Sequence, residues 1–591
     1  MKRKFILWIT AVTVIMLSAS AVRAQDIAGD WQGTLKAMGQ DTRIVLHVAK
    51  AEKGGWSGLI YYIDDSQEGS PVTSLTLKGA DFRFAIDSDH VVYEGKLSSD
   101  GNKIIGAWTE GKDSPRPLEL ARATKDTAWQ LPDPNWGHKI VKVDPRIYEG
   151  YVGRYQLTPS ITATVIHEGE HLFLQINGQP RYEIYPASSK NFFLRVARAE
   201  IAFETDTQGV ARGLVLHQNG RDLPGKKINA PTPAEIAARC QAVDALVAAE
   251  FAKHPVGSVT VGVVSGKELI WTKSYGNADM EKQLPADKDT IYRIGSITKM
   301  FTALMLEQLV DAGKVHLSDP VEKYFPEIKT VPTDFPGAPP VTLIQLAKHT
   351  SGMDREPADM EKYVQGPVSD WEMTLIAALA HTRFSIEPGT QFSYSNIGFA
   401  TLGAALGRAA GEPYTEYVPK HIFAPLGMTH TTLDYSPDMQ AHLSKGYDVE
   451  GNGKIESETP LREHKTGRGY KVPNGAIYTT VGDLAHFASF LLGHGPESVL
   501  KTAVLEKNLT NSAVQADFSL STGYTLGGQL DRRDGYVAFG HGGGVAGYQA
   551  GFEMNRDLSV AVIVFANEIG GGIGTGDLAN KALDILSKVK E

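Results

Sequence analysis

The stretch Arg293-Ile294-Gly295-Ser296-Ile297-Thr298-Lys299-Met300 carries the most informative pattern in the chain. An apolar series at helical spacing continues from it and ends near Gly313, which indicates a buried helix. Ser296 then lies at the N-terminus of this helix, and Lys299 lies one turn further on the same side. The apolar positions of the series are Ile297, Met300, Phe301, Leu304, Met305 and Leu309.

A serine and a lysine in this arrangement can supply a nucleophile and its base. A serine hydroxyl needs a nearby base to become nucleophilic, and burial can lower the pKa of a lysine enough to provide one. The helix N-terminus also favours negative charge developing near Ser296. The spacing alone is a weak signal, because Ser498 with Lys501 and Ser587 with Lys590 repeat it without a comparable buried helix after them.

Two further segments follow in the chain. Residues 389–396 read Gly-Thr-Gln-Phe-Ser-Tyr-Ser-Asn, a turn leading into a loop, and residues 540–544 read Gly-His-Gly-Gly-Gly ahead of a strand-like run at 548–554. The order S-x-x-K, Y-x-N and H-x-G resembles the serine β-lactamase-related superfamily, which includes the penicillin-binding proteins. The tyrosine form resembles its class C β-lactamases, carboxylesterases and D-aminopeptidases. The resemblance extends over roughly residues 240–585.

The resemblance implies a role for each matched residue. Ser296 attacks a carbonyl and forms an acyl-enzyme, while Lys299 and Tyr394 handle the proton; which of the two is the formal base stays open. Asn396 holds Lys299 or a substrate amide by hydrogen bonding. The backbone N–H groups of Ser296 and Gly544, the latter next to Gly543, form the oxyanion hole. No cofactor or metal is expected, since the 17 histidines include no H-E-x-x-H cluster.

The third segment departs from the Lys-Thr-Gly pattern typical of enzymes that bind substrate carboxylates. His541 replaces the lysine, and a histidine is neutral over much of the range near pH 7. We therefore expect esters, amides or D-amino-acid peptides as small-molecule substrates. Two readings stay open for His541: contact with the substrate, or support of the strand.

Two alternative functions stay open beside the hydrolysis of esters and amides. One is β-lactamase or DD-peptidase action on cell-wall peptides. The other, from a different class, is a catalytically weak peptidoglycan-binding or sensor protein. Labelling of the protein by a fluorophosphonate without turnover of any substrate would favour the second alternative.

The hydrophobic pattern divides the chain into several parts. Alternation with period two at 44–48, 82–86 and 104–108 predicts an all-β module over 25–125, and Gly29-Asp30-Trp31 resembles the opening of lipocalin-like barrels. A linker over 126–146, rich in proline and aspartate, precedes a second all-β, barrel-like module over 147–228. Residues 229–236 form another linker, and the catalytic domain spans 237–591.

Helical and strand patterns occur together in the catalytic domain. Ile236, Val243, Leu246, Val247 and Phe251 fit one helical face, whereas 259–264, 269–272 and 560–565 have the character of strands. Strands at both ends of a segment with helices between them predict a mixed, antiparallel sheet covered by helices. The chain is thus a multidomain protein with a C-terminal α/β (α+β) domain of the β-lactamase and transpeptidase type.

The N-terminus has the features of a signal peptide. Lys2, Arg3 and Lys4 precede an apolar run over 5–17, and Val22-Arg23-Ala24 fits a cleavage site. We expect removal of residues 1–24, export to the periplasm or beyond, and no stable membrane span, because the apolar run is short for an uncleaved anchor.

Composition narrows the range of partners. With 42% hydrophobic and 21% charged residues the chain is globular, and its net charge of −9 comes without a basic run that would indicate nucleic-acid binding. Cys240 is the single cysteine, so no intrachain disulfide can form. Three roles stay open for the β-modules: shaping the entrance to the site, binding cell-wall polymer, or holding a homodimer together.

Overall fold

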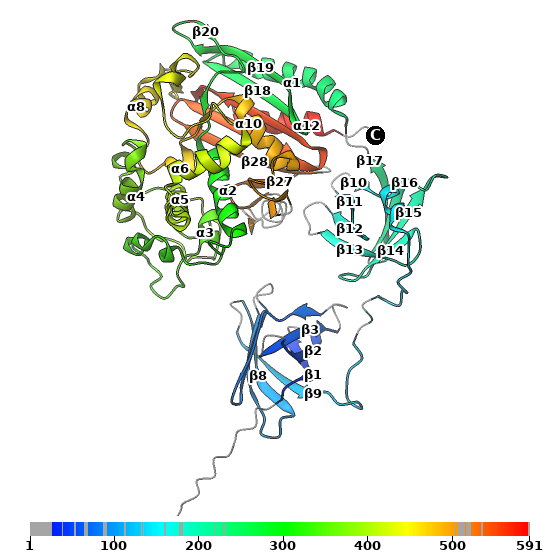
Figure 1. Cartoon of the computed structure of the whole chain (residues 1–591). Coiled ribbons are helices and arrows are strands. Elements are labelled where there is room, and N and C mark those ends of the chain that lie inside the picture. The colour runs from blue at the N-terminus through cyan, green and yellow to red at the C-terminus, as the bar shows by residue number, and fades with distance from the viewer. Residues whose placement is uncertain are drawn as a thin grey trace, which may run out of the picture. The chain divides into compact units, whose positions relative to one another are not determined.

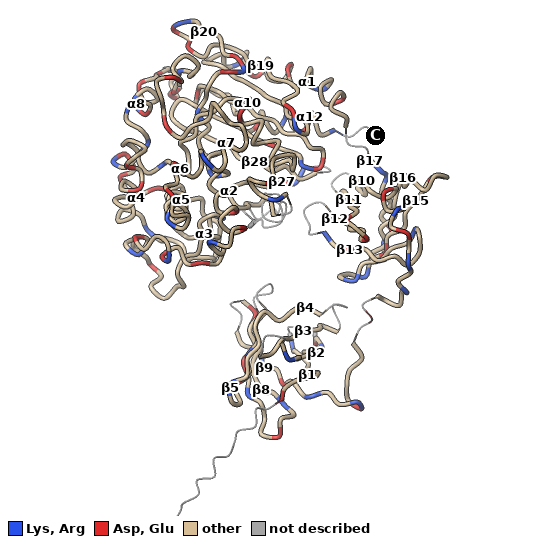
Figure 2. Tube along the Cα trace, in the orientation of Figure 1, with Lys and Arg blue, Asp and Glu red and all other residues tan. Residues whose placement is uncertain are grey.

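The computed structural model describes residues 26–588 apart from 38–39, 52–54, 64–68, 87–90, 112–113, 132, 134, 159–160, 177–180, 219, 229–230, 503, 506–513, 516–521 and 534–535. The predicted signal peptide lies outside the described residues. Lys and Arg are interspersed with Asp and Glu along the described chain (Figure 2). Among the described residues, no helix has both the length and the apolar character needed to cross a membrane.

The first module is an antiparallel meander with the strand order β4-β3-β2-β1-β9-β8-β7-β6-β5. Alternate side chains enter one shared core, in which Trp31 and Trp108 are among the largest buried residues. The strands are β1 Gly29–Ala37, β2 Gln40–Lys50, β3 Trp56–Tyr62, β4 Ser70–Pro71, β5 Ser74–Lys78, β6 Asp81–Ile86, β7 Val91–Leu97, β8 Lys103–Glu110 and β9 Arg116–Arg122.

The second module is a closed barrel in which β10 pairs with both β11 and β17. Closure leaves no exposed strand edge, and Tyr155 and Phe203 pack inside it. The strands are β10 Gly153–Thr158, β11 Ile161–Glu168, β12 His171–Ile176, β13 Arg181–Pro186, β14 Asn191–Leu194, β15 Ala199–Thr205, β16 Ala211–Gln218 and β17 Arg221–Ile228. The predicted fold of two all-β modules ahead of the catalytic domain is therefore confirmed.

The C-terminal domain, which we predict to be catalytic, is built on an antiparallel sheet with the order β20-β19-β18-β30-β29-β28-β27-β26-β25. Every residue of β18 and β30 is buried, as expected for central strands covered on both faces. The strands are β18 Ser258–Ser265, β19 Glu268–Asp279, β20 Leu284–Pro285, β25 Val514–Gln515, β26 Thr522–Tyr524, β27 Gln529–Arg533, β28 Tyr536–Val545, β29 Tyr548–Asn555 and β30 Val560–Ala566; the smaller sheets use β21 Tyr292–Arg293, β22 Tyr447–Val449, β23 Ile455–Glu456, β24 Tyr478–Thr479 and β31 Glu568–Ile569.

Helices cover the two faces of this sheet with two separate cores. Helices α1 and α12 pack on one face, and α2 and α5 belong to the larger core on the other (Figure 1). The predicted helical covering is confirmed. The helices are α1 Pro233–Lys253, α2 Thr298–Asp311, α3 Leu343–Ala347, α4 Trp371–Leu379, α5 Asn396–Ala410, α6 Tyr414–Val418, α7 Ala424–Leu426, α8 Glu458–Thr466, α9 Val472–Gly475, α10 Val481–Ser489 and α12 Thr575–Ser587.

Helix α1 begins at Pro233, inside the stretch 229–236 that we predicted as a linker. Thr232 caps the helix, because its side chain accepts a hydrogen bond from the backbone N–H of Glu235 while the Glu235 carboxylate accepts from the backbone of Thr232. Cys240 lies on the buried face of α1 with an exposed fraction of 1%, and its thiol approaches the carbonyl oxygen of Ile236.

Glu553 on β29 makes the stability of the domain dependent on pH. Burial, together with the carboxylates of Asp531 and Asp584, raises its pKa to about 8, although Arg533 opposes the shift. An unfolded glutamate loses its proton near pH 4.5, whereas the folded one keeps it up to about pH 8. The folded state therefore binds more protons in this window, and stability falls as pH rises through it, by at most about 1.4 kcal/mol per pH unit.

We expect Glu553→Gln to raise the thermal midpoint above that of the parent at pH 8 and to leave the two nearly equal at pH 4.5. Thermal unfolding at both pH values measures this difference. Glu497→Gln, at an exposed position, serves as the control. A stabilisation of equal size at both pH values would contradict the assignment.

Candidate active site

Ser296 lies where the sheet meets the main helical core. It occupies the 3₁₀ turn η3 (Gly295–Ile297), which leads directly into α2. Gly295 has a φ of +50°, and a Cβ atom there would approach the backbone nitrogen of Gly544 to 2.7 Å. The glycine therefore permits both the sharp turn and the close approach of β28 to the serine.

Lys299 is fully buried and makes three polar contacts through its amine. Its Nζ lies 3.0 Å from the Oγ of Ser296, 2.8 Å from the Oδ1 of Asn396 and 3.0 Å from the carbonyl oxygen of Asn474. Burial lowers the pKa of this lysine well below its ordinary value, and the carboxylate of Glu356 opposes the shift. The arrangement therefore favours a neutral amine beside the serine hydroxyl.

Tyr394 and Asn396 reach the site from the start of α5. Ser395 caps this helix by accepting a hydrogen bond from the N–H of Gly398, so Asn396 is the first helical residue and not part of a loop as predicted. The Tyr394 hydroxyl shares a hydrogen bond with Ser296, and burial raises the tyrosine pKa to about 12. Tyr394 is therefore protonated near neutral pH.

Strand β28 supplies the glycines on the other side of the serine. It pairs with β27 over 536–540 and with β29 over 539–545, so the edge of 541–545 opposite β29 is not paired with β27. Val545 pairs with Tyr548 across a two-residue turn, so the N–H of Val545 faces β29. The N–H groups of an antiparallel strand alternate between its two edges, and the N–H of Gly544 therefore faces away from β29. Gly543 packs against the backbone of Ile294 and Ser296. The structure thus brings all the predicted residues around Ser296.

His541 is buried, and both of its ring nitrogens contact protein groups. Nδ1 lies against the carbonyl oxygen of Gly542, which can only accept, and Nε2 lies 3.1 Å from the hydroxyl of Tyr524. Nδ1 therefore carries the proton and Nε2 accepts from the tyrosine. Burial and the nearby Lys299 lower the histidine pKa to about 4, so the ring is neutral. Of the two readings, this placement favours support of the strand.

Several residues around the site lie outside the three segments. Asn474 accepts a hydrogen bond from Lys299 through its backbone carbonyl oxygen. Arg355 is exposed, with its guanidinium 4.8 Å from the ring centroid of Tyr394. Glu356 and Lys471 form an ion pair at 3.0 Å beside Asn396. No spacing rule links these positions in the sequence, so sequence reasoning missed their part in the site.

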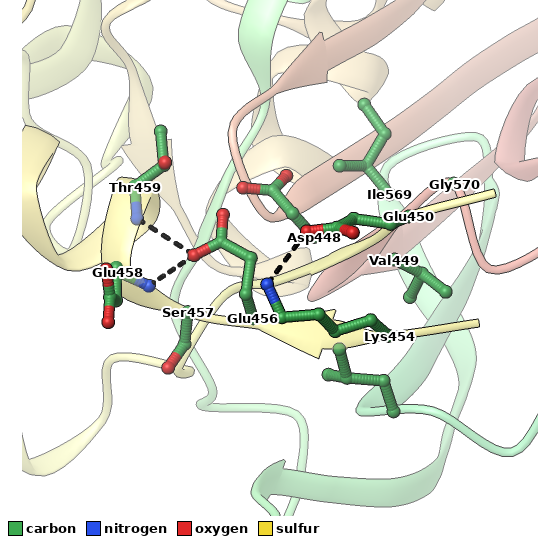
Figure 3. Close-up of a pocket in the computed structure, with 11 residues that line it drawn as sticks. Asp448, Val449, Glu450, Lys454, Glu456, Ser457, Glu458, Thr459, Ile569 and Gly570 are labelled. Carbon is green, nitrogen blue, oxygen red and sulfur yellow. Dashed lines mark hydrogen bonds and ion pairs between the residues drawn. The ribbon is translucent and has the colours of Figure 1, made fainter. Parts of the chain in front are cut away.

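A separate acidic cavity of about 770 Å³ opens between the β22–β23 hairpin and the start of α8 (Figure 3). Burial raises the pKa of Asp448 there to about 6. Lys454 pairs with Glu450, and the N–H groups of Glu458 and Thr459 donate to Glu456. The lining residues are Asp448, Val449, Glu450, Lys454, Ile455, Glu456, Ser457, Glu458, Thr459, Ile569 and Gly570, none of them a predicted site residue.

The family model described as Beta-lactamase matches residues 243–583, more than half of the chain. The chain belongs to the β-lactamase family. A second model, a domain of unknown function (DUF3471), matches residues 138–227, which contain nearly all of the closed barrel. In this β-lactamase-family chain, Ser296, Lys299, Tyr394, Asn396 and the 541–544 segment all fall inside the matched region.

Similar proteins agree with this membership. Beta-lactamase-like protein 2 of Dictyostelium discoideum is 30% identical over 334 residues, 54% of this β-lactamase-family chain and 58% of that protein. D-alanyl-D-alanine-carboxypeptidase/endopeptidase AmpH of Escherichia coli (strain K12) is 34% identical over 224 residues, 38% and 54% of the two chains. The chain thus spans a little over half the length of these relatives.

The solved structure of the octameric penicillin-binding protein homologue from Pyrococcus abyssi is also similar. It superimposes with a TM-score of 0.51 at 27% identity, covering 59% of this chain and 77% of that one. The comparisons together place the chain in the β-lactamase family.

Proposed function

We propose that the chain is an exported serine hydrolase that cleaves esters or amides, D-amino-acid derivatives included, through an acyl-enzyme on Ser296. The placement of the Lys299 amine 3.0 Å from the Ser296 hydroxyl, in a fully buried position, carries the proposal. A desolvated lysine next to a serine is a means of activating the nucleophile. The match to AmpH of Escherichia coli keeps D-alanyl peptides among the candidate substrates.

Lys299 is the better candidate for the base. A neutral amine has two N–H donors and one lone pair. The carbonyl oxygens of Asn396 and Asn474 take the two donors, which leaves the lone pair for the proton of Ser296. Tyr394 holds its proton up to about pH 12 and is therefore suited to relay a proton and not to act as a phenolate.

The proposed reaction has two halves. In the first, Oγ of Ser296 bonds to the substrate carbonyl carbon as its proton moves to Lys299, and the N–H groups of Ser296 and Gly544 hold the oxyanion. The leaving group departs with a proton passed from Lys299 through Tyr394. In the second, water gives a proton to Tyr394 as the tyrosine passes its own proton to Lys299, and the hydroxide so formed attacks the ester carbonyl on Ser296. The acid is released, and Ser296 recovers its proton.

The neutral His541 bears on substrate choice. A buried imidazole with both nitrogens engaged offers no fixed positive charge for a substrate carboxylate. A short-chain p-nitrophenyl ester and D-alanine p-nitroanilide both lack a carboxylate, so neither needs such a charge. Because p-nitrophenolate is the better leaving group, we expect the ester to be hydrolysed with a higher kcat/KM than the anilide by purified residues 25–591. L-alanine p-nitroanilide controls for stereospecificity, and the Ser296→Ala protein provides the blank.

The outcomes of this comparison separate the candidates. Ester cleavage that is absent from the blank supports esterase-type chemistry. Preference for the D-anilide over both other substrates would instead indicate that the protein is a peptidase acting on cell-wall peptides. Fluorophosphonate labelling of Ser296 without turnover of any of the three substrates would contradict the proposal in favour of a binding or sensor protein. A homodimer held by the β-modules is tested separately by light scattering of the same sample.

A further inference from the structure

Glu356 lies outside the three sequence segments, yet its carboxylate joins several groups behind the site. Its Oε1 accepts hydrogen bonds from the Nδ2 of Asn396 at 2.7 Å and from the Nζ of Lys471 at 3.0 Å. Its Oε2 accepts from the hydroxyl of Tyr470, which is fully buried. The carboxylate therefore accepts hydrogen bonds from three side chains. One of them, Asn396, also contacts Lys299.

A carboxylate determines which way a neighbouring amide points. An ionised carboxylate only accepts hydrogen bonds, so the NH₂ group of Asn396 must face Glu356 and its Oδ1 must face Lys299. The reverse orientation would put an oxygen against the carboxylate and a donor against the amine. With Oδ1 toward Lys299, one N–H of the amine is occupied and the lone pair stays available to Ser296.

We propose that Glu356 is a positioning residue, which orients the Asn396 amide and, with its ion-pair partner Lys471, sets the charge around the Lys299 amine. This inference rests on the proposed function, since it assigns how the base of that reaction is prepared. Glu356 acts through Asn396 and does not touch the reacting atoms.

The charged groups facing Lys299 come from several elements. Three cations, Arg355, Arg468 and Lys471, each disfavour a charged lysine, and Glu356 favours it. Among the described residues, Tyr394, His349 and His541 are further titratable neighbours of Lys299. Burial holds both histidines neutral near pH 7, and Tyr394 keeps its proton. Removal of the Glu356 charge should therefore lower the pKa of Lys299, and removal of the Lys471 charge should raise it.

The test is the pH profile of kcat/KM for the ester. The acid limb of this profile reports loss of the proton from Lys299 in the free enzyme. Glu356→Gln keeps the shape but removes the negative charge, so the limb is expected to move about one pH unit lower. Lys471→Met removes a positive charge and should move the limb in the opposite direction. Glu361→Gln, an exposed glutamate in the same segment, should leave it in place.

A second measurement separates charge from position. Tyr470→Phe keeps both charges and is expected to leave the limb unmoved, whereas Glu356→Ala, which frees the Asn396 amide, should lower kcat by about 10- to 100-fold. Activity losses without opposite shifts in Glu356→Gln and Lys471→Met would overturn the inference, because general structural damage gives that result. Failure of the proposed function is distinct: Ser296→Ala would then keep its activity.

Discussion

Ser296→Ala is expected to lower kcat/KM for the p-nitrophenyl ester at least ~10³-fold, because removal of the nucleophile leaves only binding and oxyanion stabilisation. The thermal midpoint should stay close to that of the parent, since the change removes one hydroxyl from a half-buried position. Steady-state kinetics and thermal unfolding of the same preparations measure the two quantities.

Ser498 provides a matched control for this prediction. It repeats the S-x-x-K spacing with Lys501, but it is exposed. Ser498→Ala should therefore retain activity and fluorophosphonate labelling, both of which Ser296→Ala should lose. Hydrolysis by Ser296→Ala within a few-fold of the parent would exclude Ser296 as the nucleophile.

Gly543→Ala is expected to lower kcat by about 10²–10³-fold, comparable with the loss of an oxyanion donor. A Cβ atom at this position would overlap the carbonyl oxygen of Ile294 and lie 3.3 Å from the backbone nitrogen of Ser296. Both obstacles are backbone, so β28 must move away from η3 and carry the N–H of Gly544 with it. Overpacking of this kind also costs about 1–3 kcal/mol of stability.

Gly542 offers the comparison one residue away on the same strand. Among the described residues other than its two chain neighbours, no atom lies within 4 Å of the Cβ that Gly542→Ala would add. Its kcat and thermal midpoint should therefore stay within experimental error of the parent. Equal kcat values for Gly543→Ala and Gly542→Ala would contradict a role for this strand edge in holding the oxyanion.

Local patterns were sufficient to predict much of the architecture. The apolar positions of α2 and the strand-like runs at β18 and β30 appear in the structure, because they depend on periodicity along a single element. The order of three short segments also predicted that Ser296, Lys299 and Tyr394 would meet. Their contacts are now described, while their catalytic roles stay predictions.

Other features of the site could not be predicted from local patterns. Glu356 and Tyr470 approach Asn396 only through tertiary structure, and no periodicity relates positions 356, 396 and 470. The environment of His541 depends on Tyr524, which lies on another strand. A histidine in a sequence can be a charged ligand or a neutral support, and only its partners decide between the two.

The burial of Cys240 has a practical consequence. Its thiol is the only one in the chain and lies on the buried face of α1, with an exposed fraction of 1%. A thiol-reactive dye can therefore attach at one residue only. The reaction requires a local opening in which α1 separates from the sheet and exposes the thiol. The rate of dye uptake under native conditions would report how often that opening occurs, without any engineered label.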